Sequence, residues 1–173
     1  MIKSKTFEAF GVKYRTTQFA AVRGLEILSK GDDIYPTEFL EKTEVLLGDE
    51  WLSLKEEENI DRGIRDEAGI LAPRVVLDGV NVVVNEFNFG FLKAWKGVKV
   101  PRKFLSDAKS VSTEYSEPIV AQLVQDEMAT LRELEEYYSL EDAFKLFDIL
   151  TAKGVNLAYQ HEQAERESKA NRR

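Results

Sequence analysis

The chain has 173 residues, no cysteine, 43% hydrophobic residues and a formal net charge of −7. This length and composition suit one domain, or one domain with an appendage, and the lack of cysteine excludes disulfides, thiolate chemistry and the common structural zinc sites. Because nonspecific DNA affinity comes from neutralising phosphates, the negative charge argues against a general DNA-binding role.

The N-terminal residues predict a β-hairpin followed by a helix. Residues 6–15 carry aromatic side chains on both sides of Gly11, which is typical of two short strands joined by a turn. Thr17 is a favourable N-cap, and apolar residues follow it at helical spacing. Lys30 and Gly31 then supply the cation and the glycine that commonly end a helix.

The next segment predicts two more helices. Pro36 suits a first helical turn, and the apolar residues that follow it predict a helix that ends at Gly48. Ser53 and Glu56 have the spacing of a capping box, which predicts a polar helix through about Glu67. That helix carries few apolar residues, so we expect one of its faces to be fully solvated.

The valine-rich segment 72–87 fits two structures. Asp78 and Gly79 between valine-rich arms indicate a hairpin. However, its apolar residues recur at helical spacing, and contiguous apolar runs break the alternation of a strand. Burying the valines stabilises a helix by more than the roughly few tenths of a kcal/mol that each β-branched residue costs. We therefore predict a buried helix, with these polar residues on its opposite face: Arg74, Asp78, Asn81 and Asn85.

The C-terminal half predicts a linker and further helices. Residues 106–116 are polar and predict the linker, and Pro118 begins a long helix whose apolar residues reach Leu134. Ser139 and Asp142 form another capping-box pattern ahead of an amphipathic helix. From residue 160 onward the chain is charged and lacks an apolar stripe, so it cannot bury itself.

Together these elements predict a mainly α fold. We expect a compact helical domain over residues 1–158, with a short N-terminal β-hairpin and a long C-terminal helix. Residues 159–173 are expected to form a charged tail or a frayed helix. No run of eighteen apolar residues occurs, and no apolar leader segment follows Met1. We therefore expect neither a membrane span nor a secretory signal.

The sequence contains no pattern that is typical of an active site. His161 is the only histidine, and it lies in the polar C-terminal segment. Phosphate-binding glycine loops are absent, and the acidic clusters lack the alternating ligand spacing of a calcium loop. We therefore expect no catalytic residue, no metal site and no cofactor.

One stretch, N-F-G-F-L-K-A-W-K-G-V-K-V-P-R-K-F at residues 88–104, combines aromatic rings with cations. Such a mixture is found in grooves that bind single-stranded nucleic acid. However, Phe87, Phe91 and Trp95 are spaced four residues apart, which would align the rings on one helix face and bury them. We therefore favour core packing or contact with another protein over contact with nucleic acid.

The same stretch supplies the candidate partner-binding residues. Its basic end is expected to dock on an acidic helix, either the protein's own region around Glu133–Glu136 or a partner's. An apolar groove is expected beside it, with Phe144 and Phe147 behind its rings. The predicted partner-binding residues are Phe89, Phe91, Trp95, Arg102, Lys103 and Phe104.

Two segments carry a resemblance to a known family. Residues 137–148 read Y-Y-S-L-E-D-A-F-K-L-F-D and precede a polar helical end. In this segment the chain resembles the tail assembly chaperones of tailed bacteriophages. Its start is also similar to that group, because the strand pair from Lys5 to Arg15 runs into T-T-Q-F-A-A at residues 16–21. Small baseplate or hub proteins of contractile-tailed phages are similar in size and pattern.

The resemblance implies a small, mostly helical, non-enzymatic factor in the cytoplasm of the infected host bacterium. Such a factor binds the tape measure protein, keeps it soluble and helps to recruit tail tube subunits around it. The alternative is a structural tail or baseplate subunit, which would be found in the virion. A nucleic-acid-binding module that uses residues 93–103 is the third and weakest hypothesis, and self-association to a homo-oligomer stays open.

Overall fold

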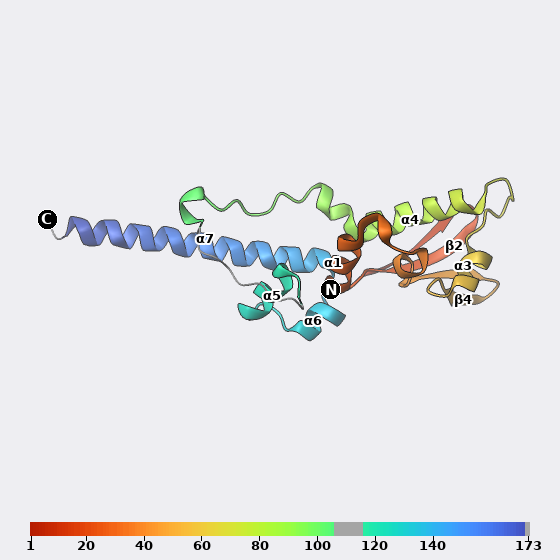
Figure 1. Ribbon diagram of the computed structural model, residues 1–173, viewed down its shortest axis with the longest axis horizontal. Coiled ribbons are helices and arrows are strands. Elements are labelled where there is room, and N and C mark those ends of the chain that lie inside the picture. Colours follow the sequence, from red (N-terminus) through yellow and green to blue (C-terminus); the bar gives the residue numbers. More distant parts are fainter. Residues whose placement is uncertain (106–115, 172–173) are drawn as a thin grey trace.

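The structure is a computed structural model that describes residues 1–105 and 116–171. Figure 1 shows an elongated molecule with a β-sheet at one end and a long helix that projects toward the C-terminus at the other. The sheet is antiparallel, with the strand order β1-β2-β3-β4. Its strands are β1 (Ser4–Ala9), β2 (Val12–Thr17), β3 (Thr43–Leu47) and β4 (Glu50–Ser53).

Helices make up most of the rest of the described residues. The α-helices are α1 (Ala21–Lys30), α2 (Pro36–Phe39), α3 (Glu57–Gly63), α4 (Pro73–Phe89), α5 (Pro118–Gln125), α6 (Leu131–Glu136) and α7 (Leu140–Ala170). Short 3₁₀ helices lie in the connections, namely η1 (Gly31–Asp33), η2 (Gly90–Lys93) and η3 (Arg102–Phe104).

The prediction of a mainly α fold is wrong, because residues 43–53 form a second β-hairpin instead of the end of a helix. Gly48 has a positive φ of 65° and lies in the turn between β3 and β4, whereas its sequence context predicts a helix C-terminus. Thr43 and Val45 are buried and Glu44 between them is half-buried, which is the alternation of a strand. The fold is therefore a mixture of α and β, with a four-stranded sheet and a long C-terminal helix.

Two other helices differ from their predicted bounds. Ser53 ends β4, and α3 begins only after Glu56, so no capping box forms between these residues. The apolar residues after Pro118 form α5 and α6 instead of one long helix. The chain turns between them at Glu127, whose φ is 56°, and Thr130 then caps α6 through a capping box with Glu133.

Three local predictions are confirmed. The N-terminal hairpin turns at Phe10 and Gly11, which both have the positive φ that a two-residue hairpin turn requires. The predicted helix over residues 72–87 is present as part of α4, with Ala72 as the N-cap, and Ser139 and Asp142 form the predicted capping box at the start of α7. Residues 106–115 of the predicted linker lie outside the described residues. The predicted boundary after residue 158 falls inside α7.

The main core lies between α4 and the sheet. Val76, Val80 and Val84 are fully buried on one face of α4, and they belong to the same cluster as Tyr14 and Val45 of the sheet. By length and composition alone, the segment Pro73–Lys93 is the one described helix that could cross a membrane. A core helix passes the same test, and these three valines place one face of α4 in a protein core.

A second cluster holds α7 to the body. Leu123 of α5 and Leu134 of α6 are fully buried against Ala143 and Leu150 of α7. An isolated β-bridge between Ala20 and Ser139 joins the start of α7 to the segment that precedes α1. The first part of α7 is therefore fixed in the body, and its remainder extends away from it (Figure 1).

Tyr14 gives the fold a testable dependence on pH. Its side chain is fully buried, and its hydroxyl donates a hydrogen bond of 2.9 Å to the carbonyl oxygen of Gly63. Burial raises the pKa of Tyr14 from 10.0 to about 12, although the nearby Arg65 opposes the rise. The neutral phenol therefore stabilises the fold below about pH 10, and this stabilisation is lost as the pH rises through about 12.

We expect one tyrosine to ionise about two pH units later than an exposed tyrosine when absorbance near 295 nm is followed in the wild type. A Tyr14→Phe variant should lack this late step and keep the others. If the variant retained the late step, a different tyrosine would be responsible and the assignment to Tyr14 would be wrong.

Candidate protein-binding site

The predicted site begins where α4 ends. Phe89 is only 6% exposed, and its ring stacks on Phe19 with a centroid distance of 6.2 Å. Phe89 therefore belongs to the core and cannot line a surface groove. Phe91 in η2 is half-buried and meets the ring of Phe144 edge-on at 5.5 Å. From Ala94 to Leu105 the chain then runs along α7, and we call these residues the strap (Figure 1).

Asp148 of α7 holds the first part of the strap. The indole Nε1–H of Trp95 donates to Asp148 Oδ2 at 2.8 Å, and the backbone N–H of Val98 donates to Oδ1 at 3.1 Å. The Trp95 ring also packs edge-on against Phe144, with centroids 4.6 Å apart. Both carboxylate oxygens of Asp148 are therefore used to position the strap.

A second contact lies further along α7. Lys103 forms an ion pair with Glu162, and the rings of Phe104 and Tyr159 meet edge-on at 4.9 Å. The ammonium of Lys103 also lies 4.8 Å from the Tyr159 ring centroid, within the range of a cation–π interaction. The hydrogen bond from Lys103, assisted by Arg166, lowers the pKa of Glu162.

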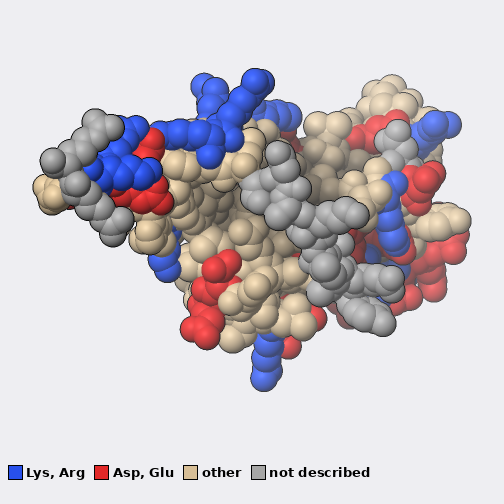
Figure 2. Space-filling view, turned by 60° about the vertical axis from the view of Figure 1, so that its left-hand side comes forward, with Lys and Arg blue, Asp and Glu red and all other residues tan. Residues whose placement is uncertain are grey.

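The strap leaves a mixed basic and apolar surface open to solvent. Lys96, Lys99 and Arg102 are exposed and form no ion pair within the part of the chain that the structure describes. Figure 2 shows lysine and arginine side chains gathered along the upper edge of the molecule. The strap also carries the exposed apolar side chains of Trp95, Val98 and Leu105, and Tyr159 is exposed on α7 beside Lys103.

The structure brings together only some of the predicted site residues. Trp95, Lys103 and Phe104 meet on α7, whereas Phe89 lies in the core and Phe147 packs in the cluster under α5. The acidic region that receives the basic strap is not Glu133–Glu136 but the face of α7 that carries Asp148 and Glu162. Helical spacing places Asp148, Tyr159 and Glu162 on one face, and this signal was available in the sequence.

A recess lies on the polar face of α4. It measures about 780 Å³ and is bordered by residues 31–39 on its other side. The predicted polar side chains of α4 line it, namely Arg74, Asp78, Asn81 and Asn85. Asp78, Glu86 and Lys93 are the acidic and lysine side chains of its lining, which includes no cysteine or histidine. Within the described residues, no group of three histidine, cysteine or acidic side chains could hold a metal ion.

No protein-family model, curated protein or solved structure matches the chain. The resemblance to tail assembly chaperones therefore remains a prediction from the sequence. The class of protein has to be inferred from the surface that the strap and α7 form.

Proposed function

We propose that the protein is a non-enzymatic assembly chaperone that binds a helical partner along the strap and α7. Following the sequence resemblance, we propose that this partner is a phage tape measure protein and that the bound complex recruits tail tube subunits. The observation that carries this proposal is the row of exposed cations and apolar side chains on a segment that is already packed against a projecting helix.

The chemistry of this surface fits an amphipathic acidic helix. Trp95 is 38% exposed, so it retains apolar surface that a partner can cover although its indole N–H is satisfied by Asp148. Lys96, Lys99 and Arg102 can pair with acidic side chains at the edge of such a contact. A tape measure protein is a long chain with apolar helix faces, which a chaperone must cover to keep it soluble. Recognition would use the helix-in-groove mode.

A pull-down from infected cells tests the proposal. Tagged wild-type chain is expected to recover the tape measure protein. A K96E/K99E/R102E variant should recover at least about tenfold less, because each introduced glutamate would repel the partner's acidic side chains. A K5E/K13E/K55E variant changes the net charge by the same amount on other surfaces and should bind like the wild type. Recovery of no tail protein by the wild type would overturn the proposal.

The second candidate function is a structural tail or baseplate subunit. The observation that favours it is α7, which extends far from the body and could be fixed permanently in a particle. Mass spectrometry of purified virions separates the two functions, because a chaperone should be absent from finished particles. Titration with single-stranded DNA at about 50 and about 200 mM salt tests the third hypothesis, since phosphate binding must weaken steeply over this range.

A further inference from the structure

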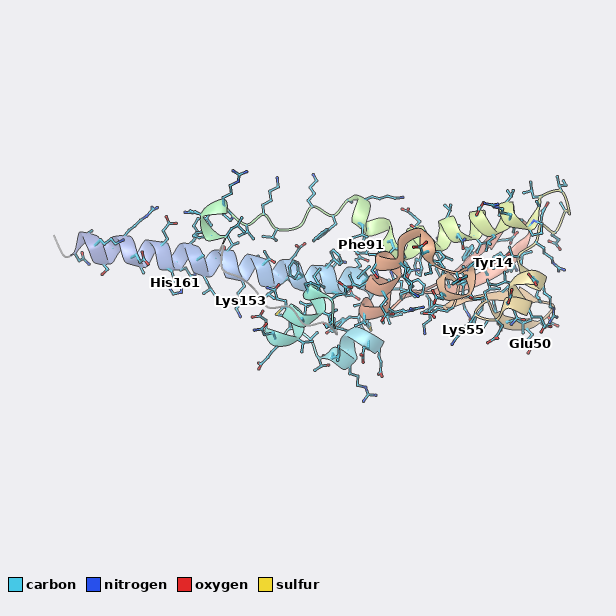
Figure 3. All side chains as sticks on the ribbon, viewed as in Figure 1. Tyr14, Glu50, Lys55, Phe91, Lys153 and His161 are labelled. Carbon is cyan, nitrogen blue, oxygen red and sulfur yellow. The ribbon has the colours of Figure 1, made fainter. Side chains whose placement is uncertain are left out.

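The face of α7 opposite the strap carries a second stripe of residues. Gly154, Leu157, His161 and Ala164 follow one another at spacings of three and four, as in the a and d positions of a heptad. Leu157 is 45% exposed, His161 and Ala164 are exposed, and a Cβ atom added at Gly154 would meet nothing within 4 Å. Figure 3 places Lys153 and His161 on the side of α7 away from the strap.

This stripe continues an interface that already exists. One heptad toward the N-terminus, the same positions are Ala143, Phe147 and Leu150, which pack in the cluster with α5 and α6. Among the residues that the structure describes, the body covers the stripe up to Leu150, and no described element covers it beyond that point. The strap lies on the other side of the helix and cannot cover it, because its contacts are to Asp148, Tyr159 and Glu162.

We propose that the open stripe pairs with the same stripe of a second copy of this chain, with the two α7 helices antiparallel. In an antiparallel pair, a positions face d positions of the other helix. His161 then lies opposite Leu157 of the second copy, and Gly154 lies opposite Ala164. The twofold axis of the dimer generates each of these facing pairs twice. The small side chains at Gly154 and Ala164 allow the two backbones to approach closely.

Charge selects the second copy and the antiparallel direction. Lys153 and Glu167 both occupy the g position that flanks the stripe, and neither forms an ion pair within the described part of the chain. Antiparallel pairing brings Lys153 of each copy to Glu167 of the other, which gives two opposite-charge pairs. A parallel pair would instead place Lys153 beside Ala158 and His161 beside His161. The surface is therefore complementary to itself, as a twofold interface requires.

The inference goes beyond the proposed function, because it uses the opposite face of α7. A dimer of this kind leaves both straps open to solvent. The two proposals can therefore fail separately, since the strap variant K96E/K99E/R102E should still dimerise, and a monomeric stripe variant should still bind a partner.

Sedimentation equilibrium of the full chain over about 1–500 μM tests the dimer. We expect the wild type to shift from monomer to dimer with concentration, and Leu157→Asp to weaken dimerisation at least about tenfold, because it removes the largest apolar side chain of the stripe and buries a carboxylate in the contact. Lys153→Glu and Glu167→Lys should each weaken it about three- to tenfold, the scale of two surface ion pairs. Asn156→Glu, on a different face of α7, should leave the association unchanged.

Combining the charge changes gives the sharpest outcome. The double variant K153E/E167K restores both opposite-charge pairs, and so does an equimolar mixture of K153E and E167K chains. Both samples should regain wild-type association, with helix content by circular dichroism equal in all samples. The proposal would be overturned by a wild type that stays monomeric at every concentration. It would also be overturned by a dimer whose dissociation constant is unchanged by Leu157→Asp and by the charge changes.

Discussion

Replacing Asn88 by alanine is expected to lower the free energy of unfolding by about 2–3 kcal/mol, because it leaves a buried backbone N–H without a partner. Asn88 lies on α4 and is only 5% exposed. Its Oδ1 accepts a hydrogen bond of 2.8 Å from the N–H of Phe19, and its Nδ2 donates to the carbonyl oxygen of Val84 at 2.9 Å. The amide therefore joins α4 to the segment between β2 and α1, where no strand or helix bond satisfies that N–H.

Asn85→Ala is the matched control for this measurement. Asn85 is one turn away on the same helix, is exposed and forms no described hydrogen bond. Alanine also has a higher helix propensity, so the control should change stability by no more than about 0.5 kcal/mol. Urea titrations of the wild type and both variants measure the urea concentration at which half of the protein is unfolded. These concentrations can be compared directly when the m-value, the dependence of the unfolding free energy on urea, is the same for all three chains. Equal midpoints for Asn88→Ala and Asn85→Ala would contradict the assigned role of Asn88.

The elements that the sequence predicted correctly are those with local causes. The turn at Phe10 and Gly11 follows from backbone conformations that a glycine favours, and the capping box at Ser139 needs residues only three positions apart. The helix α4 was recognised because its apolar period was long enough to outweigh the Asp78-Gly79 hairpin signal. In each case the deciding interaction lies within one turn or one helix.

The strands β3 and β4 were missed because their stability comes from distant partners. The segment around Leu47 and Gly48 reads equally as a helix end and as a hairpin turn. The hairpin forms because β3 pairs with β2, where Tyr14 lies opposite Val45. These two strands are separated in the sequence by α1 and α2. Apolar periodicity in a five-residue strand is too short to predict such pairing.

The candidate site could be predicted only in part, again because its contacts join residues that are far apart in the chain. The ring spacing predicted a helix that aligns Phe87, Phe91 and Trp95, but α4 ends at Phe89, and Trp95 lies in the strap that packs on α7. The partners of Trp95 and Lys103 are Asp148 and Glu162, which are 53 and 59 residues away. Helical spacing puts Asp148 and Glu162 on one face of α7, but nothing in the local pattern ranks these acids above Glu133 and Glu136, so the docking of the strap on α7 could not be predicted.

Replacing Gly63 by alanine is expected to destabilise the fold by about 1–3 kcal/mol, although alanine favours helices. Gly63 is the last residue of α3, and a Cβ atom there would lie 2.6 Å from Cγ1 of Val45. Val45 is fully buried in β3 and cannot move without disturbing the core. If α3 moved away to relieve this clash, the hydrogen bond from the Tyr14 hydroxyl to the Gly63 carbonyl oxygen would weaken.

Gly154→Ala makes the comparison decisive, because it is the same substitution in an open helix position. Nothing within the described chain lies within 4 Å of a Cβ atom at Gly154 in α7, so at a concentration at which the chain is monomeric alanine should stabilise it by about 0.5–1 kcal/mol through helix propensity. The two glycines should therefore give shifts of opposite sign in thermal or urea unfolding. The double variant G63A/V45A should be less destabilised than the sum of its single changes, because the shorter side chain removes the clash. Additive costs would mean that Gly63 is required for a reason other than its contact with Val45.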